Sequence, residues 1–125
     1  MSKRLLPSAL LAALVLAGAC EDDQGPGYLA ASLEGPIPLG AAVVDVRGTG
    51  ILGFEPAAST RVYSAVTPDG VHRVVLVAEA PSDLLFRIKV EDPSGVPPTA
   101  VLVSAADGAN LPVTSVTPFR VNVTR

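Results

Sequence analysis

Hydrophobic and polar side chains alternate with a period of two over several short stretches of the chain. In residues 84–91 the positions between the apolar ones carry Leu85, Arg87, Lys89 and Glu91. A period of two directs one set of side chains into a core and the other mostly into water, so this stretch is predicted to be a half-buried β-strand. The set predicted to point inward is Leu84, Phe86, Ile88 and Val90.

The same alternation recurs near the end of the chain and in a predicted hairpin. Phe119, Val121 and Val123 alternate with polar residues over 119–124. The stretches 61–66 and 71–78 flank Pro68-Asp69-Gly70. Proline presets the first corner of a turn and glycine accepts a positive φ, so these stretches are predicted to pair as an antiparallel hairpin.

Other stretches are more uniformly apolar. "GAAVVDVRG" (40–48) and "TAVLVSA" (99–105) are predicted to be central strands, and "YLAASLEG" (28–35) a weaker first strand. Gly48, Gly50 and Gly53 indicate a turn or bulge rather than a phosphate loop, since neither a lysine nor a helix follows. Turn signals every 8–12 residues favour an all-β fold. We expect an antiparallel β-sandwich of about seven to eight short strands, with a partly open barrel as the alternative.

The first twenty residues have a different pattern. Lys3 and Arg4 precede an uncharged run, Leu5 to Ala19, which is too short to cross a bilayer comfortably, because about 20 residues are needed. A basic start, a short apolar run and small residues before a cut site are typical of a secretory signal. Cys20, the only cysteine, follows directly.

Residues 16–20, "LAGAC", resemble the lipobox of bacterial lipoproteins, although the usual leucine three places before the cysteine is Ala17. The resemblance implies that the signal is cut before Cys20 and that the Cys20 sulfur carries a diacylglycerol. Two or three acyl chains hold a protein firmly on a membrane where one does not. We therefore expect a signal peptide (1–19), a lipidated acidic and Gly-Pro tether (20–27) and a β-sandwich domain (28–125).

The order of strands and turns over residues 41–125 also resembles a truncated cohesin-like or immunoglobulin-like envelope module. The likeness is carried by "LLFRIKVEDPSGVPPTAVLVSAADGANLPV", in which two strands, a loop and an "xDGxx" turn follow one another. Residues 41–125 are similar to the truncated modules of small uncharacterised envelope lipoproteins. This resemblance implies a bacterial envelope location, on the periplasmic side or the cell surface.

Charge and composition limit the possible partners. The chain has nine Lys and Arg against twelve Asp and Glu, and removing Lys3 and Arg4 leaves seven against twelve, a net charge of −5. The remaining basic residues are scattered singly, so no nucleic-acid surface is expected. The partners expected are the membrane, through Cys20, and an envelope protein.

Candidate chemistry is sparse. The chain contains no G-x-S-x-G elbow and no Walker A loop. His72 is interpreted as a structural histidine, and "EDPSG" (91–95) and "ADGAN" (106–110) as turns rather than calcium loops. No catalytic residue, metal or cofactor is therefore expected. An enzyme would require His72 to lie against Asp45 or Glu79.

These observations favour a non-enzymatic, lipid-anchored structural or protein-interaction module. Its partner surface is expected at the end loops, which span 68–70, 92–98 and 107–112. The alternative is a lipoprotein that binds a small ligand or glycan through Tyr28 or Tyr63, and this would require those rings to be exposed.

Overall fold

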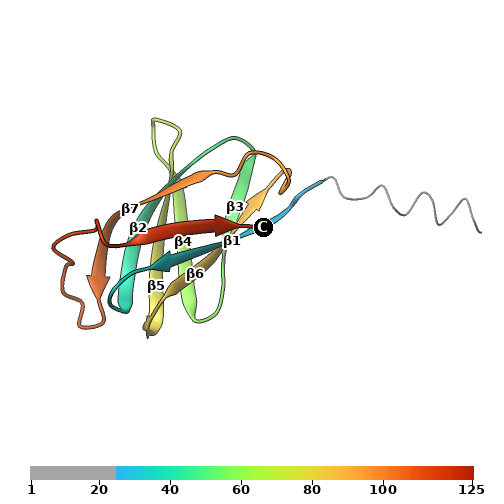
Figure 1. Cartoon of the computed structure of the whole chain (residues 1–125). Helices are drawn as coiled ribbons and strands as arrows, with labels where there is room; N and C mark the ends of the chain where they lie inside the picture. Colours follow the sequence, from blue (N-terminus) through green and yellow to red (C-terminus); the bar gives the residue numbers. More distant parts are fainter. Residues whose placement is uncertain (1–24) are drawn as a thin grey trace, which may run out of the picture.

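The computed structural model describes residues 25–125, apart from the side chains of Pro81 and Ser82, and forms a two-layer β-sandwich (Figure 1). One sheet has the strand order β3-β6-β1-β8 and the other the order β4-β5-β2-β7, with every pairing antiparallel. The strands are β1 (Gly27–Glu34), β2 (Leu39–Arg47), β3 (Ile51–Pro56), β4 (Thr60–Val66), β5 (His72–Ser82), β6 (Leu84–Val90), β7 (Thr99–Asp107) and β8 (Arg120–Thr124). The predicted all-β antiparallel sandwich is confirmed, and its two sheets are separate rather than joined into a barrel.

The core lies between the sheets and is built by the predicted alternation. In β6, Leu84, Phe86 and Ile88 are fully buried while Leu85 and Arg87 are exposed. Inward positions of the opposite sheet meet them, because a strand buries every second side chain against the facing layer. The largest fully buried side chains are Phe86, Leu33, Leu76, Leu84, Ile88, Val44, Val46 and Val74.

The hairpin predicted around Pro68 is present as β4 and β5. Val66 pairs with His72, so the two strands meet directly across the turn. The Gly70 N–H donates to the Thr67 carbonyl at 2.9 Å, and Gly70 has φ = +81°, a conformation that glycine adopts without steric cost. The turn residues therefore fix the register of this pair.

One strand position differs from the prediction. β2 is central, between β5 and β7, as its apolar sequence indicated, but β7 is an edge strand of the same sheet. In β7, Leu102 is buried whereas Val101 and Val103 are exposed. Its uniformly apolar sequence therefore reflects an apolar outer surface rather than burial on both sides.

Candidate functional site

The two outer faces of the sandwich differ in chemistry. The outer positions of the β3-β6-β1-β8 sheet are mainly polar. They include a cluster in which the Tyr28 hydroxyl donates to Glu55 Oε1 at 2.9 Å and the Arg87 guanidinium lies 4.8 Å from the Tyr28 ring centroid. Arg87 also pairs with Glu55 at 3.0 Å. The Glu55 hydrogen bond raises the pKa of Tyr28, because it stabilises the protonated phenol.

The outer face of the β4-β5-β2-β7 sheet is mainly apolar. We call this surface the valine face. Its apolar members are Ala41, Val43, Tyr63, Ala65, Val75, Val77, Val101 and Ala106. Tyr63 is 57% exposed and Val101 56% exposed, and both lie on edge strands. Contiguous exposed apolar surface of this kind marks contact sites in soluble domains, so the valine face is the candidate functional site.

Strand pairing arranges the valine face in rows that run across the sheet. The middle row is Tyr63, Val75, Val43 and Ser104, one residue from each strand. The row nearer the β4–β5 turn is Ala65, Arg73, Asp45 and Val101. The row on the other side is Arg61, Val77, Ala41 and Ala106.

Four charged side chains of the valine face are paired within the chain, and a fifth, Arg47, lies exposed at the end of β2. Arg73 donates from Nε and Nη2 to the two carboxylate oxygens of Asp45, at 2.8 and 3.0 Å. These hydrogen bonds hold the pKa of Asp45 below its ordinary value and raise that of Arg73. Arg61 lies 3.9 Å from Glu79, and both side chains are exposed. The surface is therefore close to neutral within an acidic chain.

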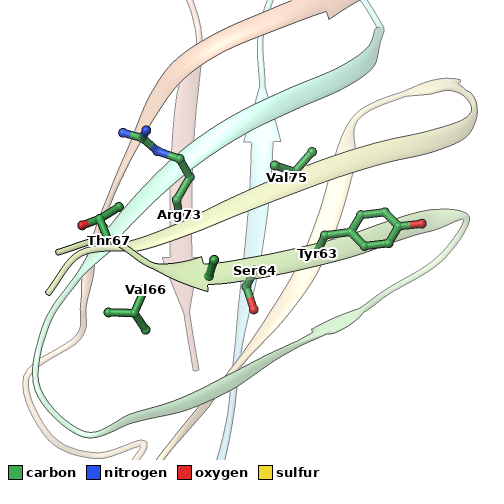
Figure 2. A pocket seen from close by; sticks show the side chains of 7 residues that line it. Tyr63, Ser64, Val66, Thr67, Arg73 and Val75 are labelled. Atoms are coloured by element: carbon green, nitrogen blue, oxygen red, sulfur yellow. The ribbon is translucent and has the colours of Figure 1, made fainter.

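Two open hollows flank Val75 on this face. One, of about 320 Å³, is lined by residues that include Tyr63, Thr67 and Arg73 (Figure 2). Figure 2 shows Thr67, Arg73 and Val75 pointing to one side of β4 and β5, and Ser64 and Val66 to the other. The second hollow, of about 300 Å³, lies over β2 and β7 and is lined by Ala41, Ala42, Val43, Val75, Ser104, Ala105, Ala106, Asn110 and Pro112.

The three loops predicted as a partner surface do not lie together. The Pro68–Gly70 turn lies at the end of the sheet where β2 finishes, because His72 pairs with Val46. The 92–98 loop lies at the same end, because Thr99, which follows it, pairs with Arg47 at the end of β2. The 107–112 loop lies at the opposite end, because Asp107 pairs with Leu39 at the start of β2. The loops at 68–70 and 92–98 therefore lie at one end of the sheet and the loop at 107–112 lies at the other, and a partner surface at the end loops stays a prediction.

His72 and the acidic turns have local structural partners. The His72 ring lies 5.6 Å from the Phe54 ring, while Asp45 pairs with Arg73 instead. Asp92 Oδ1 accepts from the hydroxyl and then from the backbone N–H of Ser94, and these hydrogen bonds lower the pKa of Asp92. Asp107 accepts from two backbone N–H groups of its own turn, at 2.9 and 3.0 Å. Over residues 25–125 no three His, Cys, Asp or Glu residues gather in a group that would hold a metal ion.

The two tyrosines named as candidate ligand contacts are both exposed, but only one borders a hollow. Tyr63 lines the first hollow, whereas Tyr28 is held by Glu55 and covered by Arg87 on the opposite face.

Cys20, the predicted lipidation site, and most of the predicted tether lie outside the described residues. Within the described part of the chain, no helix is long and apolar enough to cross a membrane.

Comparison of the chain with models of known protein families, with characterised proteins and with solved structures finds no match.

Proposed function

We propose that this chain is a non-enzymatic, lipid-anchored protein of a bacterial envelope that acts as a structural or protein-interaction module, and that the valine face is its contact surface. The observation that carries the proposal is the contrast between the two sheets. Outer positions of one sheet are mainly polar and include the Arg87–Glu55 ion pair, whereas those of the other present valines and Tyr63 to solvent around the paired Arg73 and Asp45. Leaving such a surface in water is unfavourable, by about 25 cal/mol for each Å² of apolar area that a partner would cover.

The proposed anchor lies close to the domain. Cys20 precedes Gly27, the first residue of β1, by seven positions, so a fully extended tether reaches at most about 25 Å. Acidic residues 21–23 are repelled by anionic headgroups, which favours a domain held off the bilayer. A domain held this way meets other envelope proteins at high local concentration.

The anchor is tested by Cys20→Ser in a bacterial host that processes lipoproteins. The wild-type chain should appear in the membrane fraction with the mass of residues 20–125 plus acyl chains. Cys20→Ser should keep the unprocessed mass without added lipid, because serine has no thiol to form the thioether. Equal masses and equal fractionation of the two chains would remove the anchored part of the proposal.

The contact surface is tested by photo-cross-linking in intact cells. A photoreactive amino acid replaces Val75 on the valine face or, as the matched control, Ala30, which is exposed on the outer face of the other sheet. Val75 should give a discrete adduct and Ala30 should give none. Equal labelling from the two faces would contradict the proposal.

The second candidate function is binding of a small ligand or glycan, and it is favoured by one observation. Tyr63 is exposed beside a hollow of about 320 Å³ that also contains Arg73 and Thr67, a combination of stacking ring and polar groups suited to a sugar. N-acetylglucosamine added to the isotope-labelled chain would then shift the NMR signals of Tyr63 and Thr67 saturably. Signals that stay unchanged at millimolar sugar would remove this candidate for that ligand.

A further inference from the structure

We infer that the valine face joins two copies of this chain, in an isologous dimer whose two-fold axis runs along the strands between β5 and β2. This inference rests on the proposed function, because it names the partner of the same surface. In an isologous contact, if residue i of one copy meets residue j of the other, residue j also meets residue i. The rows of the valine face satisfy this condition.

The middle row is complementary to itself when it is reversed. Rotation about the proposed axis exchanges the positions of β4 and β7 and those of β5 and β2. Val75 of one copy then faces Val43 of the second copy, and Tyr63 faces Ser104 of the second copy. Apolar side chains meet at the axis, and the largest side chain of the row lies over one of the smallest.

The hollow over β2 and β7 is suited to receive Tyr63. Its floor is made by small side chains, including Ala41 and Ala106, and its volume of about 300 Å³ is adequate for one aromatic ring. Ser104 and Asn110 at this hollow supply polar groups for the tyrosine hydroxyl. Tyr63 protrudes on one edge strand and the hollow lies at the other, as a two-fold contact requires.

The row nearer the β4–β5 turn adds matching charges. Arg73 of one copy faces Asp45 of the second copy, and Ala65 faces Val101 of the second copy. The two ion pairs of the dimer would thus lie side by side across the axis with alternating sign. A partner of unrelated sequence would need this charge order by chance, whereas a second copy has it by symmetry.

The third row places Val77 over Ala41 of the second copy, and Arg61 over Ala106 of the second copy. Arg61 lies on an edge strand with an exposed side chain, so its guanidinium reaches the rim while its methylenes cover the alanine. None of these three rows brings like charges together.

The area of the valine face suits a weak to moderate dimer. Four strands about 4.8 Å apart and seven to eleven residues long, at ~3.4 Å per residue, give the whole outer face of the sheet roughly 580 Å² per copy, and about 1,150 Å² in total. Specific interfaces bury more than about 1,000 Å². An anchor at Cys20 would confine both copies to one membrane and raise their effective concentration.

The test is a chemical cross-link between a cysteine introduced by Tyr63→Cys in one chain and a cysteine introduced by Ser104→Cys in another. Facing sheets pack about 10 Å apart, beyond the ~4.4–6.8 Å Cα separation of a disulfide, so a short bis-maleimide is the suitable reagent. The two Tyr63 positions of the dimer would lie about 17 Å apart, because they are separated by three strand spacings within the plane of the sheets and by one spacing between the facing sheets. Full-length chains with two different affinity tags are expressed together and cross-linked in isolated membranes.

The control pair is Ala30→Cys with Thr124→Cys, on the outer face of the other sheet. Cys20 stays in place in all chains. A lipidated Cys20 has no free thiol and cannot react with the maleimide. If Cys20 were not lipidated, cross-linking through its thiol would appear equally in the control pair. That result would contradict the proposed anchor and would leave the dimer unaffected.

We expect a product that carries both tags from Tyr63→Cys with Ser104→Cys, at least tenfold above either variant paired with itself and above the control pair. Adding Val75→Lys to both chains should reduce the product to the control level, because two lysines would be buried at the axis. A yield no higher than the control, or one unaffected by Val75→Lys, would overturn the dimer. A discrete photo-adduct from Val75 without the two-tag product would assign the valine face to a different protein, and the proposed function would stand.

Discussion

Leu84 and Leu85 offer a matched test of the packing described above. They are adjacent, chemically identical and on the same strand, but Leu84 is fully buried and Leu85 is 37% exposed on the outer face. Leu→Ala removes three carbons, worth about 0.8 kcal/mol each in transfer free energy. At Leu84 the cavity left behind adds to this, and the loss of unfolding free energy should reach about 3–5 kcal/mol.

The loss at Leu85 should be much smaller. About 63% of the residue is buried by the fold, which limits the transfer contribution to about 1.5 kcal/mol, and water fills the space at the surface. The two variants should therefore differ by at least ~1.5 kcal/mol, or by about 6–12 °C in Tm for a domain of this size. Urea unfolding followed by far-UV circular dichroism measures both, and the slope m should stay unchanged.

Equal losses at the two positions would contradict the assignment of inner and outer faces, because that assignment predicts a difference. A larger loss at Leu85→Ala would show that the polar outer face of the β3-β6-β1-β8 sheet is in fact buried.

Two further predictions concern the β4–β5 turn and the valine face. Gly70→Ala should lower the free energy of unfolding by about 1 kcal/mol or more, because φ is +81° at this position. Gly53→Ala is the control and should lower it little, because Gly53 has no positive φ and no atom lies near its added Cβ. Thermal unfolding of the two variants measures the difference. The Arg73 guanidinium lowers the pKa of Asp45 from its ordinary 3.8, so the pair stabilises the fold above about pH 4 and loses that contribution as the pH falls through the lowered value. Arg73→Gln should raise the pKa of Asp45 in a carboxyl NMR titration, and an unchanged midpoint would contradict the pairing.

Sequence patterning was sufficient for the core. The alternation at Leu84, Phe86 and Ile88 identified which side chains are buried. A strand with one solvent-exposed face can remove these three large apolar side chains from water only by placing them all on its other face. The Pro68-Asp69-Gly70 turn likewise determined the β4–β5 hairpin, since glycine is the residue that tolerates the required backbone angle.

The candidate site was harder to predict, because a uniformly apolar strand has two explanations. Val101 and Val103 suggested that β7 is central and covered on both sides, yet they are exposed at an edge strand. The signal was available: outward positions on three neighbouring strands, Val75 on β5, Val43 on β2 and Val101 on β7, are valine where a solvated strand would carry Thr, Lys or Glu. Recognising it required knowing that these strands share one sheet, which depends on long-range pairing that local pattern does not determine.

Thiol accessibility in the native membrane measures directly whether the valine face is covered in the working protein. Val75→Cys and Ala30→Cys are each treated with a bulky maleimide before and after the membranes are dissolved in denaturant, and the two rates of modification are compared. We expect Val75→Cys to react at least tenfold more slowly in the membrane than after denaturation, while Ala30→Cys reacts readily in both. Equal protection at the two positions, or free reaction at Val75→Cys in the membrane, would contradict this expectation.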